Sequence, residues 1–108
     1  MRSQAAKRDS NEREIIDALE AMGCSVTQLS QPGVPDLLIG VAYHNLLLEV
    51  KSPGESLTPQ QRVWHNAWHG TAHVVWTVAE AIEIVGHYIK KGPPCHAKPI
   101  KQSSTTKS

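Results

Sequence analysis

Residues 35–51 of this 108-residue chain are Pro-Asp-Leu-Leu-Ile-Gly-Val-Ala-Tyr-His-Asn-Leu-Leu-Leu-Glu-Val-Lys, and this stretch decides the fold. Its two runs, 36–42 and 46–51, are apolar except at their ends, which is typical of strands buried on both faces. The gap between the runs is short, so we expect a hairpin with its turn around Tyr43 and His44. The sequence thus predicts two neighbouring strands that lie between two layers of the fold.

Three charged side chains lie at the ends of these strands. Alternate residues of a strand share one face, so Glu49 and Lys51 point the same way. A turn with an even number of residues places Asp36 on that face as well, opposite or nearly opposite the other two. Burying two carboxylates is costly unless they are paired or bind a metal, and Mg²⁺ accepts one or two carboxylates. We therefore expect a metal-dependent catalytic centre in which Lys51 orients a water or stabilises the transition state.

A purely structural interpretation of the same residues is also open. A Glu-x-Lys pair alone is usually a solvated strand edge or an ion pair, and Asp36 could simply begin a strand. The combination favours catalysis, because Pro-Asp opens one apolar strand and Glu-Val-Lys closes the next.

The first expected helix offers a third carboxylate. Glu12 shares the inner side of this helix with Ile15, Ile16 and Leu19, which follow it at helical spacing. Glu14 falls on the outer side. Glu12 therefore either joins the metal site or complements the positive end of the helix, and the sequence does not decide between these roles.

The remaining pattern predicts one α/β domain over residues 10–92, between a flexible basic arm at 1–9 and a disordered basic tail at 93–108. Thr58 and Thr77 each open a capping box, and Pro59 occupies the first position of a helix. The expected elements are a helix from 10 or 11 to 22, an edge strand at 25–30, the two hairpin strands, a helix from 59 to about 70, a strand at 72–76, and a helix from 78 to about 92 with Ala81, Ile82, Val85 and Ile89 facing inward. This order, α-β-β-β-α-β-α, predicts a mixed central sheet flanked by helices.

Charge and composition leave the class of partner open. Net charge is +1, with all ten acidic residues between Asp9 and Glu83 and eight of the eleven basic residues in the two ends. Basic ends could bind phosphates, whereas an acidic middle favours nucleic acid only with a bound cation or a specific groove. No run is long and apolar enough to cross a membrane, and Cys24 and Cys95 match no CxxC pattern. We therefore expect a reduced, cytoplasmic setting in a bacterial or viral-host cytosol.

Taken together, these motifs resemble the PD-(D/E)xK nuclease superfamily, which includes Holliday junction resolvases, and they look most like its VRR-NUC branch. The resemblance covers residues 11–86 and rests on the segments 12–16 (EREII), 35–38 (PDLL), 48–51 (LEVK), 57–64 (LTPQQRVW), 74–76 (VVW) and 80–81 (EA). The strand at 73–77 lacks the Val-Arg-Arg triplet that names the branch, so no role for arginines is expected there.

The resemblance implies a restriction-endonuclease-like core and a DNA endonuclease that hydrolyses phosphodiester bonds to leave a 5′-phosphate. It implies that Asp36, Glu49 and the backbone carbonyl of Val50 bind Mg²⁺ or Mn²⁺. Lys51 would assist the attacking water, and Glu12 would be the helix-borne acid of the site.

Five side chains of the second expected helix have two interpretations each. Gln61 occupies the place of a glutamine of the VRR-NUC branch, but it is also the third residue of a capping box. His65 and His69 have the spacing of a zinc pair, yet no third ligand is evident, so we expect surface histidines. Trp64 and Trp68 could stack on bases, although such a stripe is more often core or a subunit interface.

On this resemblance we expect a homodimeric, metal-dependent nuclease that cuts branched DNA such as Holliday junctions, in DNA repair or recombination. One alternative is a nuclease for flaps, ends or linear duplex. Another is a non-catalytic DNA-binding or assembly module that keeps the fold. The sequence holds no clear code for the substrate.

Overall fold

The computed structural model describes residues 10–95, so the predicted arm at 1–9 and residues 96–108 of the predicted tail lie outside the described residues. The elements in the described part are α2 (Ser10–Ala21), β1 (Ser25–Gln28), β2 (Leu37–Val41), β3 (His44–Val50), α3 (Pro59–Ala67), β4 (Ala72–Val75) and α4 (Val78–Lys91). Their order is the predicted α-β-β-β-α-β-α, and the α/β fold class is confirmed. None of the described helices is long and apolar enough to cross a membrane.

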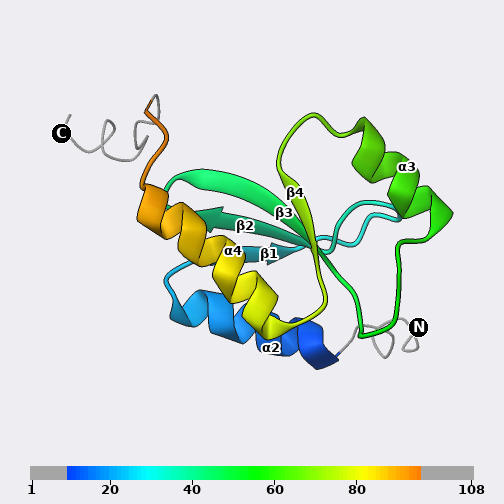
Figure 1. Cartoon of the computed structure of the whole chain (residues 1–108), viewed down its shortest axis with the longest axis horizontal. Coiled ribbons are helices and arrows are strands. Elements are labelled where there is room, and N and C mark those ends of the chain that lie inside the picture. The colour runs from blue at the N-terminus through cyan, green and yellow to red at the C-terminus, as the bar shows by residue number, and fades with distance from the viewer. Residues whose placement is uncertain (1–9, 96–108) are drawn as a thin grey trace.

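The strands form one mixed sheet in the order β1-β2-β3-β4. β1 pairs with β2 and β2 pairs with β3 in antiparallel fashion, whereas β4 lies parallel to β3. β1 is therefore an edge strand, as its short alternating sequence predicted. A parallel pair needs a crossover connection, and the segment that contains α3 provides it (Figure 1).

The hairpin turn is tight and lies one residue earlier than expected. Val41 at the end of β2 pairs with His44 at the start of β3, so the turn consists of Ala42 and Tyr43 alone. Both turn residues have positive φ angles, 50° and 64°, as in a type I′ turn, whose twist matches that of the flanking strands. The predicted position of the turn was wrong by one residue, but the number of turn residues is even.

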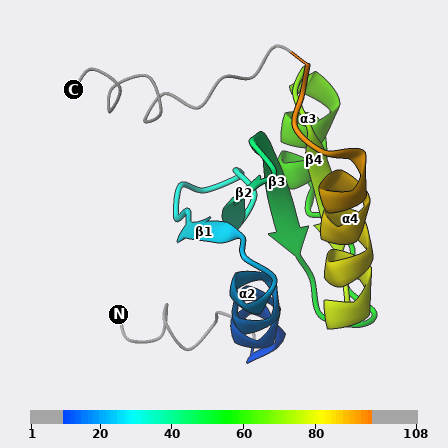
Figure 2. The ribbon, with the colours of Figure 1, turned by 90° about the vertical axis from the view of Figure 1, so that its left-hand side faces the viewer.

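One face of the sheet packs against α2 and α4, and this side holds the hydrophobic core (Figures 1 and 2). Leu37 of β2 and Leu48 of β3 are paired and completely buried. The other core members come from neighbouring strands and the two helices, with Cys24 in the connection after α2: Ile15, Ile16, Leu19, Cys24, Ile39, Val41, Leu46, Val50, Val75, Ala81 and Val85. Burial of these side chains is the main source of the stability of the fold.

The opposite face of the sheet lies toward α3 and is covered less completely. Leu47 is buried, but Leu38, which is paired with it, is 38% exposed. No residue of α3 is buried. The prediction that both hairpin strands are buried on both faces is therefore wrong for β2, because α3 does not cover its outer positions.

Helix α4 departs from the prediction on its outer side. Ala81 and Val85 are buried as predicted, but Ile82 and Ile89 are exposed. Ile84 packs against the core instead. Positions 81, 84 and 85 follow the three-and-four spacing of one helix face, whereas position 82 is rotated by about 100° from position 81.

Both predicted capping boxes form, and they fix where α3 and α4 begin. In each box a threonine side chain accepts a hydrogen bond from the N–H three positions on, and the side chain of that residue accepts one from the threonine N–H. The pairs are Thr58 with Gln61 and Thr77 with Glu80. Helix α3 ends at Ala67, earlier than expected, because Trp68 adopts an extended conformation.

Candidate active site

The open end of the β2–β3 hairpin brings Asp36 and Glu49 face to face. Leu37 pairs with Leu48 in antiparallel strands, so the residue before Leu37, Asp36, lies opposite the residue after Leu48, Glu49. Oδ2 of Asp36 accepts a hydrogen bond from the backbone N–H of Val50 at 2.8 Å. This bond ties Asp36 to β3 just beyond the last regular pair of the two strands.

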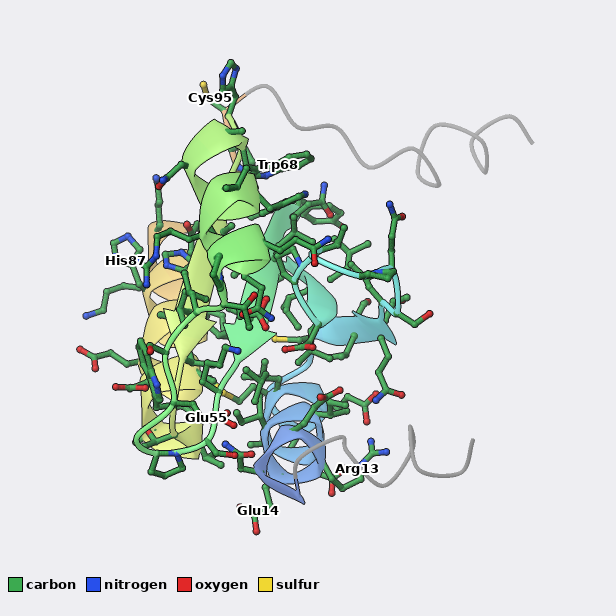
Figure 3. All side chains as sticks on the ribbon, turned by 90° about the vertical axis from the view of Figure 1, so that its right-hand side faces the viewer. Arg13, Glu14, Glu55, Trp68, His87 and Cys95 are labelled. Atoms are coloured by element: carbon green, nitrogen blue, oxygen red, sulfur yellow. The ribbon has the colours of Figure 1, made fainter. Side chains whose placement is uncertain are left out.

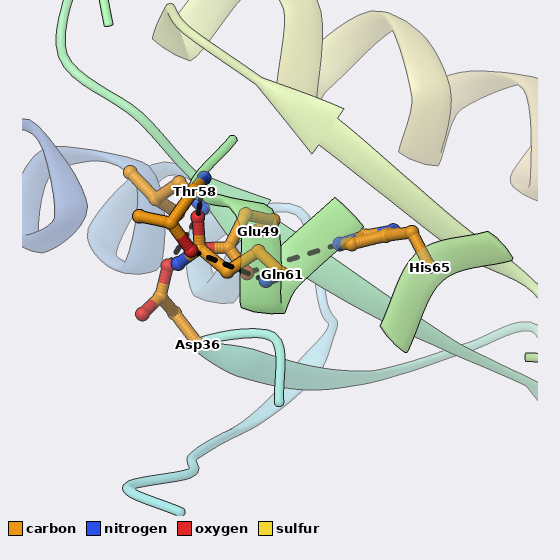
Figure 4. A network of polar contacts seen from close by, with 6 residues as sticks. Asp36, Glu49, Thr58, Gln61 and His65 are labelled. Atoms are coloured by element: carbon orange, nitrogen blue, oxygen red, sulfur yellow. Dashed lines mark hydrogen bonds and ion pairs between the residues drawn. The ribbon is translucent and has the colours of Figure 1, made fainter. Parts of the chain in front are cut away.

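Glu49 is the most deeply buried charged side chain of the described residues, with 2% of its surface exposed. Its Oε2 accepts a hydrogen bond from Gln61 Nε2 on α3 at 3.1 Å (Figure 4). Its Oε1 has no hydrogen-bond partner among the described residues. A buried carboxylate oxygen without a donor is costly, so this oxygen suits a cation or a further donor.

Burial and neighbouring charge raise the pKa of Glu49 to about 8. Loss of hydration is the largest cause, followed by the charge of Asp36 and a hydrogen bond between the two carboxyl groups. The positive charge of Lys51 lowers this pKa, and the charge of Glu12 raises it. Two carboxyl groups in contact share a proton unless other positive charge replaces it, and a divalent cation is such a charge.

Lys51 follows the end of β3 on the same face as Glu49, and it is buried. Its backbone is held from two sides. The N–H donates to the carbonyl of Val75 at 2.9 Å, and the carbonyl accepts from Asn11 Nδ2 at 3.2 Å. The charge of its amino group lies near enough to Glu49 to lower the pKa of that carboxyl group.

Glu12 faces inward from α2 and is buried, as predicted, while Glu14 on the same helix points outward (Figure 3). Oε2 of Glu12 accepts a hydrogen bond from Gln28 Nε2 of β1 at 3.0 Å. The charge of Glu12 raises the pKa of Glu49, so Glu12 lies near the two facing acids. Its role as a metal ligand stays a prediction.

Asp36, Glu49 and the backbone carbonyl of Val50 together offer a set of oxygen ligands. The N–H and C=O of a strand residue point to the same side, so the Val50 carbonyl faces Asp36 as its N–H does. Among residues 10–95, no three His, Cys, Asp or Glu side chains lie close enough to hold a metal ion by themselves. Mg²⁺ does not need three, since it typically binds one or two carboxylates and keeps several waters. The buried Glu49 carboxylate, whose hydrogen bonding is incomplete, and the facing Asp36 fit a hard divalent cation.

Gln61 combines the two roles that the sequence left open. Its Oε1 accepts a hydrogen bond from the Thr58 N–H at 2.9 Å, and its own N–H donates to Thr58 Oγ1 at 3.1 Å. Its Nε2 donates to Glu49. The capping box thus orients the amide, so that one end closes the first turn of α3 and the other holds the buried acid.

His65 is the residue of this site that sequence reasoning missed. It was expected at the surface, but only 13% of its side chain is exposed, and its Nε2 lies 3.8 Å from Glu49 Oε1. Burial lowers the pKa of His65, which favours the neutral imidazole. Its position one turn after Gln61 was the available signal, because residues four apart share a helix face. His69 is exposed, as expected.

Trp64 and Trp68 stack on each other, with ring centroids 4.7 Å apart and an interplanar angle of 18°. They line a largely apolar pocket of about 460 Å³ between α3 and the sheet. The other lining residues are Leu29, Val34, Leu38, Asn45, Leu46, Leu47, Gly70 and Thr71. Trp68 is exposed just after α3 (Figure 3), so this aromatic pair is not part of the closed core.

Comparisons with known proteins bear on the fold. No family model and no curated protein matches the sequence. A solved structure described as a "VRR_NUC domain" is similar to this chain, with a TM-score of 0.62 and 25% sequence identity, over 71% of this chain and 91% of that one. The chain therefore has a VRR-NUC nuclease-like fold.

Proposed function

We propose that the chain is a divalent-metal-dependent DNA endonuclease that hydrolyses phosphodiester bonds. The observation that carries this proposal is the position of Asp36 opposite the buried Glu49 at the open end of the hairpin. Burial and the charge of Asp36 raise the pKa of Glu49 to about 8. Placing two acids together in a buried position lowers stability unless a cation binds between them. The nuclease-like fold supports the same conclusion.

Asp36, Glu49 and the Val50 carbonyl would hold the cation, Mg²⁺ or Mn²⁺. When bound, the cation polarises the scissile phosphate and lowers the pKa of the attacking water. Gln61 holds the Glu49 carboxylate through its 3.1 Å hydrogen bond, and the Val50 N–H holds Asp36 at 2.8 Å. The acids are thus oriented before the substrate binds, which reduces the entropy lost during the reaction.

Lys51 supplies positive charge beside the two acids. Its buried position separates it from bulk water, where charge interactions are weak. The amino group would orient the attacking water or stabilise the negative charge that develops on the phosphate. In-line attack, with the 3′ oxygen as leaving group, would leave a 5′-phosphate, as in the nucleases that the motifs resemble.

We further propose branched DNA, such as a Holliday junction, as the substrate and a homodimer as the active form. Support for a dimer comes from the apolar pocket lined by Trp64 and Trp68, because exposed apolar and aromatic surface is common at subunit interfaces. Two centres in one dimer would allow paired nicks in opposite strands. Flaps, DNA ends and linear duplex are the alternative substrates.

The test measures cleavage of labelled DNA by the wild type and by Lys51→Ala in Mg²⁺, Mn²⁺ or EDTA. A four-way junction is compared with a flap and a linear duplex. We expect metal-dependent cleavage, fastest on the junction, and a rate that falls by about 10²–10³-fold in Lys51→Ala.

The matched control is Lys90→Ala, which removes an exposed lysine from the last turn of α4 and should cleave like the wild type. Equal cleavage by the wild type and Lys51→Ala would contradict the proposed centre. No cleavage by either protein on any substrate would indicate a non-catalytic module that keeps the fold.

A further inference from the structure

Helix α3 reaches Glu49 with two side chains from successive turns. Gln61 and His65 are four residues apart, so they project from the same face of the helix. Gln61 donates to Oε2 of Glu49, and His65 lies beside Oε1 (Figure 4). No residue of α3 is buried, so contacts of partly exposed side chains, these two among them, join the helix to the sheet.

Two buried atoms at this contact lack hydrogen-bond partners among the described residues, Oε1 of Glu49 and Nε2 of His65. They lie 3.8 Å apart, about 0.9 Å more than a normal N–H···O hydrogen bond. The proposed hydrogen bond requires the two side chains to approach each other by this amount. The two atoms are complementary when Nε2 carries the proton, because one is then a donor and the other an acceptor.

We propose that His65 is a positioning residue for Glu49. The Nε2–H of His65 donates to Oε1 while Gln61 donates to Oε2, so α3 holds the carboxylate at both oxygens and leaves its other lone pairs for a divalent cation. This inference rests on the proposed function, because the orientation of Glu49 matters for metal binding. Hydrogen bonds to a ligating carboxylate orient it and control the affinity of the site.

The geometry separates this role from direct metal binding. Asp36 and His65 lie to opposite sides of Glu49 in Figure 4. We therefore place a cation held by Asp36 and Glu49 on the side of Glu49 away from His65, and we assign His65 a role through Glu49.

The main test is the affinity of the protein for Mn²⁺, measured by electron paramagnetic resonance of the free ion. We expect His65→Ala to weaken Mn²⁺ binding by about tenfold or more. His65→Gln should restore most of the affinity, because its amide can donate to the same oxygen. The matched control, His69→Ala, removes an exposed imidazole one turn further along the helix and should bind Mn²⁺ like the wild type.

A second measurement reports on His65 in the wild-type protein, so it does not require that any variant fold. Long-range ¹H–¹⁵N correlation spectra should show the tautomer of His65 that carries its proton on Nε2. Addition of Mg²⁺ should shift this signal, because Glu49 is the shared partner. A proton on Nδ1, with Nε2 bare, would overturn the positioning role.

The outcomes distinguish this inference from the proposed function. Mn²⁺ binding that Asp36→Asn abolishes but His65→Ala leaves unchanged overturns the role of His65 alone. Failure of His65→Gln to recover the affinity lost in His65→Ala contradicts hydrogen-bond donation as the mechanism. Absence of Mn²⁺ binding by the folded wild type overturns the proposed metal site, and the role of His65 with it.

Discussion

The two faces of the β2–β3 hairpin are built from the same strands but have different environments. On the side of α2 and α4, Leu37 and Leu48 are completely buried in the apolar core. On the side of α3, Leu38 is exposed to solvent while Glu49 is buried as an acid. Side chains alternate along a strand, so a single residue step separates a group that stabilises the fold from one that destabilises it. Stability is concentrated on one face, which allows the other to hold unfavourable charge.

The largest effect should come from a substitution on the core face. Leu48→Ala removes a completely buried side chain and should lower the free energy of unfolding by about 2–5 kcal/mol. Leu38→Ala, on the α3 face, removes a side chain that is 38% exposed and should lower it by about 1 kcal/mol. Urea denaturation followed by circular dichroism measures both. Equal losses would show that the α3 face is packed as tightly as the core.

Glu49→Gln should impair catalysis on the α3 face of the hairpin without weakening the packing of the core face. The amide keeps the shape of the side chain but cannot replace the carboxylate, so cleavage of DNA should slow by about 10²-fold or more. In EDTA at pH 8 the free energy of unfolding should not fall below that of the wild type, because the amide has no charge to bury. Parallel loss of cleavage and stability would assign Glu49 to the core instead.

The raised pKa of Glu49 predicts how the stability of the metal-free protein depends on pH. The ordinary pKa is 4.5 and the folded value is about 8, so between these values the native state keeps a proton that the unfolded chain releases. The free energy of unfolding should therefore fall as pH rises from about 6.5 to 8, with a slope approaching about 1.4 kcal/mol per pH unit. It should level off just above the folded pKa, below the pH at which Cys24 titrates, because burial raises the pKa of that thiol from its ordinary 9.0. Denaturation in EDTA at several pH values measures the slope.

The buried histidines set the lower end of the pH range in which this prediction can be tested. Burial lowers the pKa of His65 and of His73 below the ordinary histidine value of 6.5. Their contributions to the free energy of unfolding are therefore complete above the ordinary value and are lost as pH falls through the lowered values. Above the ordinary histidine pKa of 6.5, the slope of the free energy of unfolding against pH reports Glu49. Glu49→Gln should flatten it, and a slope that persists in the variant would have another origin.

The smallest effects should come from the two capping threonines, and they should differ in kind. Thr77→Ala weakens α4, which packs in the core, so the global free energy of unfolding should fall by about 1 kcal/mol. Thr58→Ala weakens α3, which has no buried residue, so the loss should appear mainly as faster local amide exchange in α3. Hydrogen exchange and urea denaturation of both variants make the comparison. The same global loss in both would mean that α3 and the core unfold as one unit.

Local patterns were enough to predict the elements and most of the core face. Thr58 and Thr77 marked the starts of two helices, and the spacing of Ile15, Ile16 and Leu19 defined the buried side of α2. These signals involve residues within a few positions of each other. The facing of Asp36 and Glu49 followed from strand alternation and an even turn, even though the turn itself was misplaced by one residue.

Contacts between distant segments could not be predicted in the same way. The burial of His65 depends on where the connection at 51–58 carries α3, and no periodicity in that polar segment specifies its path. The exposure of Ile82 and Ile89 depends on which of two overlapping apolar stripes of α4 meets the sheet. In both cases the sequence defines the helix, but tertiary packing decides its rotation and position.

The two-residue turn of Ala42 and Tyr43 sets the register that places Asp36 opposite Glu49, so the number of turn residues matters for the site. A single-codon insertion there has two outcomes. Either the loop takes up the extra residue as a three-residue turn with a bulge and Val41 still pairs with His44, or one strand slips, so that Asp36 leaves Glu49 and the strand presents its opposite side. Substitutions in the turn are far less damaging, and residues such as Asn or Gly suit its positive φ angles better than those present. The identity of the turn residues is therefore less constrained than their number.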